Sequence, residues 1–248
     1  MPDLMWNASM WDKNYVWEEA GEEWSRQWGG SEAQWFGSLY PRLHRFLPAR
    51  RILEIAPGHG RWSQFLIANC DDFLAIDLSA SCVDICERRF ADVAFARFAS
   101  NDGQDLSAAA DGSYDMVFSF DSLVHAEIEV FERYVPQILA KLAPGGVAFI
   151  HHSNRADADH DEGEHGHSRA TSMSASIIRR LVRDHGGVIV MQEVIDWQGA
   201  GPIDCLTMFA KRGDYDDRVA HPVVNREFFI EAKLIGEYQA PYSKLVRK

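Results

Sequence analysis

A glycine-rich turn follows an apolar stretch early in the chain, in the segment ILEIAPGHGRW from Ile52 to Trp62. Gly58 and Gly60 carry no Cβ, so backbone N–H groups at the start of the following helix can approach a ligand closely. A dinucleotide fingerprint would read G-x-G-x-x-G, whereas Ser63 stands here in place of the third glycine. The turn therefore predicts a small-molecule site but does not by itself identify the ligand.

Polar residues follow the next two predicted strands. The stretch LAIDLS ends a strand at Asp77, where a carboxylate can accept hydrogen bonds from both hydroxyls of a ribose. The segment FASNDGQDL places Asn101, Asp102 and Gly103 after the third strand, where an adenine amine could be bound. We therefore expect an adenosine-containing ligand. The structural alternatives are an ordinary tight turn at the glycines and a helix N-cap at Asp77.

Three histidines at expected strand ends could accept a proton. His125 follows the fourth strand, and His151 and His152 end the fifth. Histidine is the natural general base near neutral pH, and strand alternation sends the two adjacent histidines to opposite faces. We place His152 first and His125 next as the base, with a hydrogen-bonded structural role as the alternative for each. Asp121 could orient a histidine, bind an amino group of the ligand, or be a plain loop carboxylate.

The polar segment Asn154–Arg169 contains histidines and acidic residues that could bind a divalent metal, namely His160, Asp161, Glu162, Glu164, His165 and His167. Magnesium prefers oxygen ligands, however, and this cluster is rich in histidine. We expect a solvated loop rather than a metal site. Arg169, which closes the segment, could hold an acidic acceptor or could be a surface charge.

Apolar strands alternate with helical segments from Arg50 to about Arg212, which indicates a parallel sheet covered on both faces. Helices are expected from Arg61, from Ser79 to Arg89, from Glu127 to Leu142, after a cap at Ser172 or Ser174, and in the segment NREFFIEAKLIGEY. The stretches VIVMQEVIDW and DCLTMFAKR are expected to form an antiparallel pair.

Six of the eight tryptophans precede the first strand: Trp6, Trp11, Trp17, Trp24, Trp28 and Trp35. The last four recur at intervals typical of one helical stripe. This stripe could pack on the core, form a lid over a ligand, or do both. We expect three parts, namely a helical N-terminal extension or lid (1–49), a ligand-binding domain (50–212) and an extension that packs on the domain or on a partner subunit (213–248).

The composition narrows the classes of partner. The 248 residues carry a formal net charge of -12, so phosphate backbones and anionic membranes are repelled overall. The four cysteines (Cys70, Cys82, Cys86 and Cys205) match neither a disulfide framework nor a zinc pattern, and we expect them to be reduced and buried. Neither a leader sequence nor an apolar run long enough to span a bilayer is present, so we expect a soluble cytoplasmic protein.

In the order of these motifs, the chain resembles the class I S-adenosylmethionine-dependent methyltransferases from Arg50 to about Arg212. It is most similar to small bacterial O-methyltransferases that act on sugars or related hydroxylated metabolites. The resemblance implies an α/β fold with a doubly wound, Rossmann-like sheet of seven strands, mostly parallel with the last strand inserted antiparallel. The sequence APGHG departs from the glycine or cysteine that is commoner at its second position.

The resemblance also implies the cofactor S-adenosylmethionine, with S-adenosylhomocysteine as its product, and a divalent metal is an alternative that we do not favour. The implied cofactor-binding residues are Glu54, Ala56, Pro57, Gly58, Gly60, Trp62, Asp77, Leu78, Asn101, Asp102, Gly103 and Phe120.

We expect methylation of an oxygen atom of a sugar or small hydroxylated metabolite, with a histidine as general base. The D/N-P-P-Y/F tetrapeptide typical of many amine and nucleobase methyltransferases is absent after the fourth strand. An N-methyltransferase of a small molecule, a catalytically silent binding module and a nucleotide-dependent oxidoreductase are the alternatives. We expect neither a nucleic-acid partner nor membrane insertion. The acceptor, metal use and a homo-oligomeric state stay open.

Overall fold

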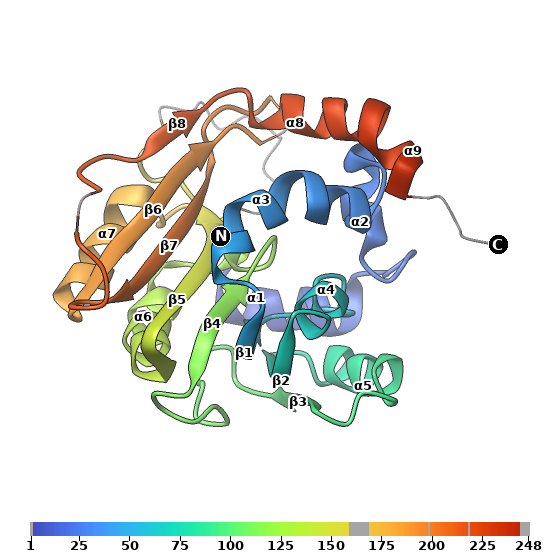
Figure 1. Cartoon of the computed structure of the whole chain (residues 1–248), viewed down its shortest axis with the longest axis horizontal. Coiled ribbons are helices and arrows are strands. Elements are labelled where there is room, and N and C mark those ends of the chain that lie inside the picture. The colour runs from blue at the N-terminus through green and yellow to red at the C-terminus, as the bar shows by residue number, and fades with distance from the viewer. Residues whose placement is uncertain (1, 159–168, 198, 218, 244–248) are drawn as a thin grey trace.

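The computed structural model describes residues 2–158, 169–197, 199–217 and 219–243. Within these residues, one sheet has eight strands in the order β3-β2-β1-β4-β5-β7-β6-β8 (Figure 1). β7 runs antiparallel to β5 and β6, and the other neighbouring pairs are parallel. The predicted doubly wound, mostly parallel sheet is therefore confirmed. The strands are β1 (Ala49–Ile55), β2 (Cys70–Asp77), β3 (Ala96–Ser100), β4 (Tyr114–Ser119), β5 (Leu142–Ser153), β6 (Gly187–Ile195), β7 (Asp204–Lys211) and β8 (Val223–Asn225).

The expectation of seven strands is wrong by one, because the C-terminal extension adds β8 beside the edge strand β6. The valines Val223 and Val224 are both exposed, so β8 lacks the buried apolar pattern by which the other strands are recognised. A short edge strand with exposed side chains gives no clear signal in the sequence.

The named helices are α1 (Leu4–Ser9), α2 (Ser31–Gln34), α3 (Tyr40–Leu43), α4 (Ser63–Ile67), α5 (Ala80–Arg89), α6 (Ile128–Lys141), α7 (Ala175–Asp184), α8 (Phe228–Leu234) and α9 (Ala240–Ser243). Helix α5 begins after Ser79, whose hydroxyl accepts from the N–H of Cys82. Helix α7 begins after Ser174, whose hydroxyl accepts from the N–H of Ile177. Of the two proposed caps for α7, Ser174 is therefore the one observed.

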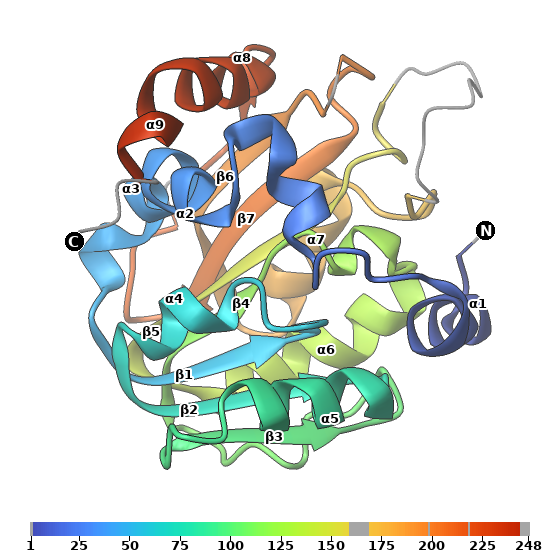
Figure 2. The same ribbon diagram turned by 90° about the vertical axis from the view of Figure 1, so that its right-hand side faces the viewer.

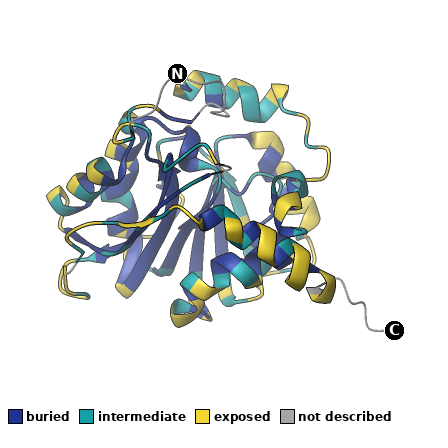
Figure 3. Cartoon of the chain, turned by 90° about the horizontal axis from the view of Figure 1, so that it is seen from above, coloured by how far each residue is buried: buried dark blue, intermediate teal, exposed yellow. Residues whose placement is uncertain are grey.

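The helices cover both faces of the sheet (Figure 2). On one face α2, α3, α4 and α8 pack over the strands, with Trp35, Leu66 and Phe228 fully buried in that core. On the other face α6 and α7 bury Phe131 and Ile178. Figure 3 shows the central strands mostly buried and the outward helix surfaces exposed. The carboxyl ends of the parallel strands remain available for a site.

The N-terminal tryptophans do not form the single helical stripe that their spacing predicts. Gly21 and Gly29 adopt left-handed φ values of 92° and 84°, and they end the helical turns on either side of the 3₁₀ segment Glu22–Trp28. Trp28 and Trp35 consequently enter the core, whereas Trp17 and Trp24 reach the cavity described below. Core packing is therefore observed for Trp28 and Trp35, and a role of Trp17 and Trp24 as a lid over a ligand stays a prediction.

The C-terminal extension packs on the domain through an ion-pair cluster. Arg42 of α3 lies 2.8 Å from carboxylate oxygens of both Glu193 in β6 and Glu231 in α8. Beside it, Trp28 contacts Phe228 with ring centroids 6.5 Å apart. Residues from the two ends of the chain thus share one core.

Two expectations from the composition can be compared with the structure. All four cysteines are unpaired, and all are buried except Cys70, which is half-buried. None of the described helices combines the length and the apolar composition that crossing a bilayer requires.

Candidate active site

The glycine turn leaves β1 through a strained residue. Ala56 has a φ of +57°, a left-handed conformation that costs a residue with a Cβ about 1–2 kcal/mol. Its N–H donates to the carbonyl of Ile76, and its carbonyl accepts from the hydroxyl of Ser122. Ala56 therefore begins the turn in a left-handed conformation, which its hydrogen bonds with Ile76 and Ser122 hold in place.

The two glycines of the turn serve different contacts. A Cβ on Gly58 would lie 2.8 Å from the indole ring of Trp17, on the cavity side. A Cβ on Gly60 would lie 2.7 Å from the ring of Phe90, beside α5. Gly58 therefore borders the cavity, and Gly60 allows the turn to pack closely against Phe90 at the end of α5.

Asp77, at the end of β2, joins two loops of the site. One carboxylate oxygen accepts from the N–H of Gly58 at 3.0 Å, and the other accepts from the N–H of Ser79 at 2.8 Å. Burial raises the pKa of Asp77 to about 6, while these backbone N–H groups partly oppose the shift. Since Ser79 provides the cap of α5, Asp77 is left to face the cavity.

Glu54 lies beneath the glycine turn rather than in the cavity. Its carboxyl group is buried and accepts from the hydroxyl of Ser63 at 2.5 Å. Burial raises its pKa to about 8, partly offset by the Ser63 hydrogen bond, and the charge of Asp77 raises it further. Glu54 and Ser63 thus support the turn from below.

The loop after β3 is shaped by its own side chains. The amide oxygen of Asn101 accepts from the N–H of Gly103, and its amide nitrogen donates to the hydroxyl of Tyr134. The carboxylate of Asp102 accepts from the N–H of Gln104. Only Gly103 of the three predicted loop residues lines the cavity, together with Tyr134.

A cavity of about 100 Å³ lies at the carboxyl ends of β1, β2 and β4. Ten of the residues proposed from the sequence line it: Ala56, Pro57, Gly58, Trp62, Asp77, Leu78, Gly103, Phe120, Asp121 and His125. Pockets for drug-sized ligands usually measure about 300–1,000 Å³. The N-terminal side chains therefore take up room that a large ligand needs.

The N-terminal segment, residues 3–24, forms one wall of this cavity with Leu4, Asn7, Trp11, Trp17, Gly21 and Trp24. The side chain of Asn7 donates to the carbonyl of His125 at 2.9 Å. One carboxylate oxygen of Asp12 accepts from the hydroxyls of Ser79 and Ser81 at 2.7 and 3.0 Å. Asn7 and Asp12 are not predicted from the sequence, because isolated polar residues between tryptophans carry no motif.

The three candidate histidines occupy different environments. His152 is fully buried, its ring nitrogens lie 2.8 Å from the carbonyl of Ser153 and the hydroxyl of Thr207, and burial lowers its pKa to about 4. His151 packs on the opposite face, against Phe120, as strand alternation predicts. Neither of them lines the cavity, whereas His125 does.

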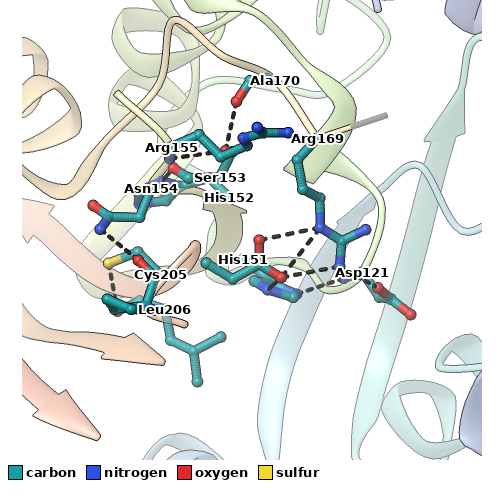
Figure 4. A network of polar contacts seen from close by, with 12 residues as sticks. Asp121, His151, His152, Ser153, Asn154, Arg155, Arg169, Ala170, Cys205 and Leu206 are labelled. Carbon is teal, nitrogen blue, oxygen red and sulfur yellow. Dashed lines mark hydrogen bonds and ion pairs between the residues drawn. The ribbon is translucent and has the colours of Figure 1, made fainter. Parts of the chain in front are cut away.

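A buried ionic network forms the floor beside β4 and β5 (Figure 4). Asp121, at a left-handed φ of +62°, accepts from Arg61 at 2.8 Å, and its N–H donates to Nδ1 of His151. Arg169 lies 2.9 Å from Asp204 and 3.9 Å from Asp121. Burial alone would raise the pKa of Asp204, but the charge of Arg169 holds it well below its usual range.

Arg61 and Asp204 were not among the residues proposed from the sequence. Arg61 directly follows the glycine turn, which is the signal that could have identified it. Arg169 is 4% exposed, so it is not a surface charge.

The proposed metal-binding side chains, His160, Asp161, Glu162, Glu164, His165 and His167, lie outside the described residues. Across residues 2–158, 169–197, 199–217 and 219–243, no cluster of three His, Cys, Asp or Glu side chains could hold a metal ion.

Comparisons with known proteins agree with this geometry. Residues 52–146 match the model of a methyltransferase domain family. No curated protein matches the chain significantly. Among similar solved structures is the N-methyltransferase NodS from Bradyrhizobium japonicum WM9 with S-adenosylhomocysteine, at 16% identity and a TM-score of 0.56, over 80% of this chain and 91% of NodS.

Two further structures have the same fold. An S-adenosylmethionine-dependent methyltransferase from Clostridium acetobutylicum ATCC 824 is 15% identical, with a TM-score of 0.57 over 76% of this chain and 92% of its own. The [4+2]-cyclase SpnF is 16% identical, with a TM-score of 0.55 over 75% of this chain and 81% of its own. Residues 52–146 therefore resemble a methyltransferase domain, and the chain has the fold of NodS, of the Clostridium acetobutylicum methyltransferase and of SpnF.

Proposed function

We propose that this protein binds S-adenosylmethionine in the cavity and uses it to methylate a small acceptor. The observation that carries the proposal is the carboxylate of Asp77, which lines the cavity and is joined to the N–H of Gly58. A ribose that donates both hydroxyls to Asp77 would lie beside the glycine turn. The similar fold of NodS, which was solved with S-adenosylhomocysteine, supports this assignment.

The other cofactor contacts follow from the walls of the cavity. Leu78 and Gly103 lie on the β2 and β3 side, where we place the adenine. Gly58 and Arg61 lie on the turn side, where backbone N–H groups and a guanidinium suit the cofactor's own carboxylate. When bound, the cofactor supplies an electrophilic methyl group on a sulfonium. We assign its contacts to Ala56, Pro57, Gly58, Arg61, Trp62, Asp77, Leu78, Gly103 and Phe120, with Glu54, Gly60, Asn101 and Asp102 as supporting residues.

For a hydroxyl acceptor on a sugar or small metabolite, we propose His125 as the general base. His125 lines the cavity, and its ring centroid lies 5.0 Å from that of Trp11 in the N-terminal segment. The geometry does not support His152 in this role, because both of its ring nitrogens have hydrogen-bond partners and its side chain is fully buried. His151 is a positioning residue, since its Nδ1 holds the backbone of Asp121.

A nitrogen acceptor is the second candidate, because the structurally similar NodS is an N-methyltransferase. Transfer of a labelled methyl group onto matched panels of hydroxylated and amino metabolites distinguishes the two. For oxygen transfer, His125→Ala should lower the rate by roughly 10²–10⁴-fold. For a catalytically silent module, no member of either panel would gain label although the cofactor binds.

Calorimetric titration with S-adenosylhomocysteine tests the cofactor assignment. Asp77→Ala should weaken binding about 10–100-fold, because hydrogen bonds to a charged group are lost. Asp72→Ala is the matched control, since Asp72 lies in the same strand β2 and pairs with Arg51 and Arg97 away from the cavity. Folded wild-type protein that fails to bind the compound would refute the proposal.

A further inference from the structure

Arg169 is a buried cation at the wall of the cavity. It is 4% exposed, and its guanidinium packs over the indole ring of Trp197 at 5.4 Å. Its Nε and Nη2 both bond to Asp204, at 3.1 and 2.9 Å. The position of the guanidinium is therefore fixed from behind by a buried carboxylate and from the side by an aromatic ring.

One donor of this guanidinium remains unused. Within the described part of the chain, the guanidinium of Arg169 donates from Nε and Nη2 to Asp204 and forms no hydrogen bond from Nη1, and Arg169 is one of the residues that line the cavity. Almost all buried polar groups in native proteins have a partner, so a buried donor that faces a cavity calls for one there. The partner should be an acceptor on a ligand.

The arginines and carboxylates around Arg169 are equal in number, and the imidazole of His151 lies 3.2 Å from Asp204 beside them. Arg61 and Arg169 contribute two positive charges, and Asp121 and Asp204 contribute two negative charges. Adding one anionic group would leave a single negative charge, which the sulfonium of S-adenosylmethionine would offset. A monoanion is therefore favoured over a neutral group or a dianion.

The position in the sheet separates this donor from the ribose site. Arg169 is anchored at Asp204, where β7 begins, and Asp77 ends β2, with β1, β4 and β5 between these two strands. Four strand spacings of about 4.8 Å place Asp204 roughly 19 Å from the ribose site. Arg61, next to the glycine turn, lies nearer to the cofactor's own carboxylate.

We propose that Arg169 binds a carboxylate of the methyl acceptor, so that the substrate is a small carboxylic acid. The inference rests on the proposed methyltransferase function, and it assigns specificity to Arg169, Asp204 and Asp121. Asp204 and Trp197 set the angle of the guanidinium, and Asp121 limits the ligand to the open Nη1 side.

The experiment compares carboxylates with their uncharged amides on protein loaded with S-adenosylhomocysteine. The probes are two pairs of acid and amide, benzoate with benzamide and lactate with lactamide. Tryptophan fluorescence and calorimetry measure the binding of each probe. At least one acid should bind about tenfold or more tightly than its amide, because the bond to Arg169 is charge-assisted. Arg169→Gln should remove this preference while the affinity for S-adenosylhomocysteine stays within about twofold. Arg183→Gln, which alters an exposed ion pair with Asp217, should keep it.

A second variant covers the case in which Arg169→Gln leaves Asp204 uncompensated and fails to fold. Arg169→Gln/Asp204→Asn removes both charges together, and it should bind S-adenosylhomocysteine but no longer distinguish acid from amide. Equal binding of acids and amides to the loaded wild type, or no binding of either, would overturn the carboxylate assignment and leave the cofactor site standing. Loss of S-adenosylhomocysteine affinity in the double variant would assign Arg169 to the cofactor and would also overturn it. Failure of the wild type to bind S-adenosylhomocysteine would instead refute the proposed function.

Discussion

Asp77 is the residue on which the proposed cofactor contacts depend most, because it lines the cavity and joins two of its loops. It accepts backbone N–H groups from Gly58 and Ser79, and its burial makes the ionised form costly. The carboxylate loses hydrogen bonds from water because it is buried. The hydroxyls of a bound ribose would donate hydrogen bonds in their place. Asp77 therefore accounts for the shape of the two loops, and in the proposed function it also accepts from two adjacent ribose hydroxyls.

The raised pKa of Asp77, about 6, gives cofactor binding a pH dependence. The ribose hydroxyls donate to the ionised carboxylate, so below this pKa binding must first remove a proton. The dissociation constant of S-adenosylhomocysteine should increase by up to about tenfold per pH unit below pH 6 and level off above it. Calorimetry from pH 5 to pH 8 measures this, and Asp77→Asn should flatten the profile. A wild-type profile as flat as that of the variant would contradict the role of Asp77.

At the same scale, the sequence predicts the residues that follow strands but not the network between them. Gly58, Asp77 and Gly103 can be found because each lies next to an apolar run. Arg61 and Asp121 are 60 positions apart in the sequence and meet only when β4 lies beside β1. No local pattern reports such a pairing.

Among the larger elements, the N-terminal segment determines access to the cavity. Its polar contacts with the rest of the chain include those of Asn7 with the carbonyl of His125, of Asp12 with Ser79 and Ser81, and of Glu22 with Ser31. Trp17 stacks on His59, with ring centroids 4.2 Å apart, over the glycine turn. We therefore expect the segment to shift when the proposed cofactor binds in this cavity.

Asp12→Ala should loosen this segment without unfolding the domain. Amide hydrogen exchange in residues 4–14 should become faster, while exchange in the central strands stays unchanged, because local opening involves only the contacts that are lost. Glu18→Ala is the control, since Glu18 pairs with Arg26 at the surface. Unchanged exchange in residues 4–14 would show that Asp12 does not anchor the segment.

The sequence identifies helices better where a cap and an apolar stripe coincide. Ser79 and Ser174 begin α5 and α7 as predicted, because their hydroxyls satisfy N–H groups of the first turn. The tryptophan spacing misleads, because Gly21 and Gly29 redirect the chain between members of the stripe. A regular spacing of tryptophans predicts one face of a helix only if the chain stays helical between them, and these two glycines interrupt the helix.

At the scale of the whole molecule, the two ends of the chain close one face of the sheet together. Arg42 joins α3 to both β6 and α8, and Trp28 packs on Phe228. Charges that are paired and largely buried are costly to separate. The N-terminal and C-terminal parts should therefore unfold with the domain rather than before it.

Arg42→Met tests this coupling. It leaves Glu193 and Glu231 without their shared cation, and the free energy of unfolding should fall by about 2–4 kcal/mol in a single transition. Arg51→Met, at an exposed pair with Asp72, should cost less than about 1 kcal/mol. Urea denaturation followed by fluorescence and circular dichroism measures both variants. Two separate transitions in the wild type would contradict the shared core.

The central claim is that the crevice between the glycine turn and Asp77 holds the adenosine of S-adenosylmethionine. A crystal structure of the protein with S-adenosylhomocysteine measures this directly. We expect the ribose hydroxyls within hydrogen-bond distance of both Asp77 carboxylate oxygens, the sulfur directed toward Asp121, and Trp17 moved from Gly58. A ligand bound elsewhere, with Trp17 still against Gly58, would contradict the claim.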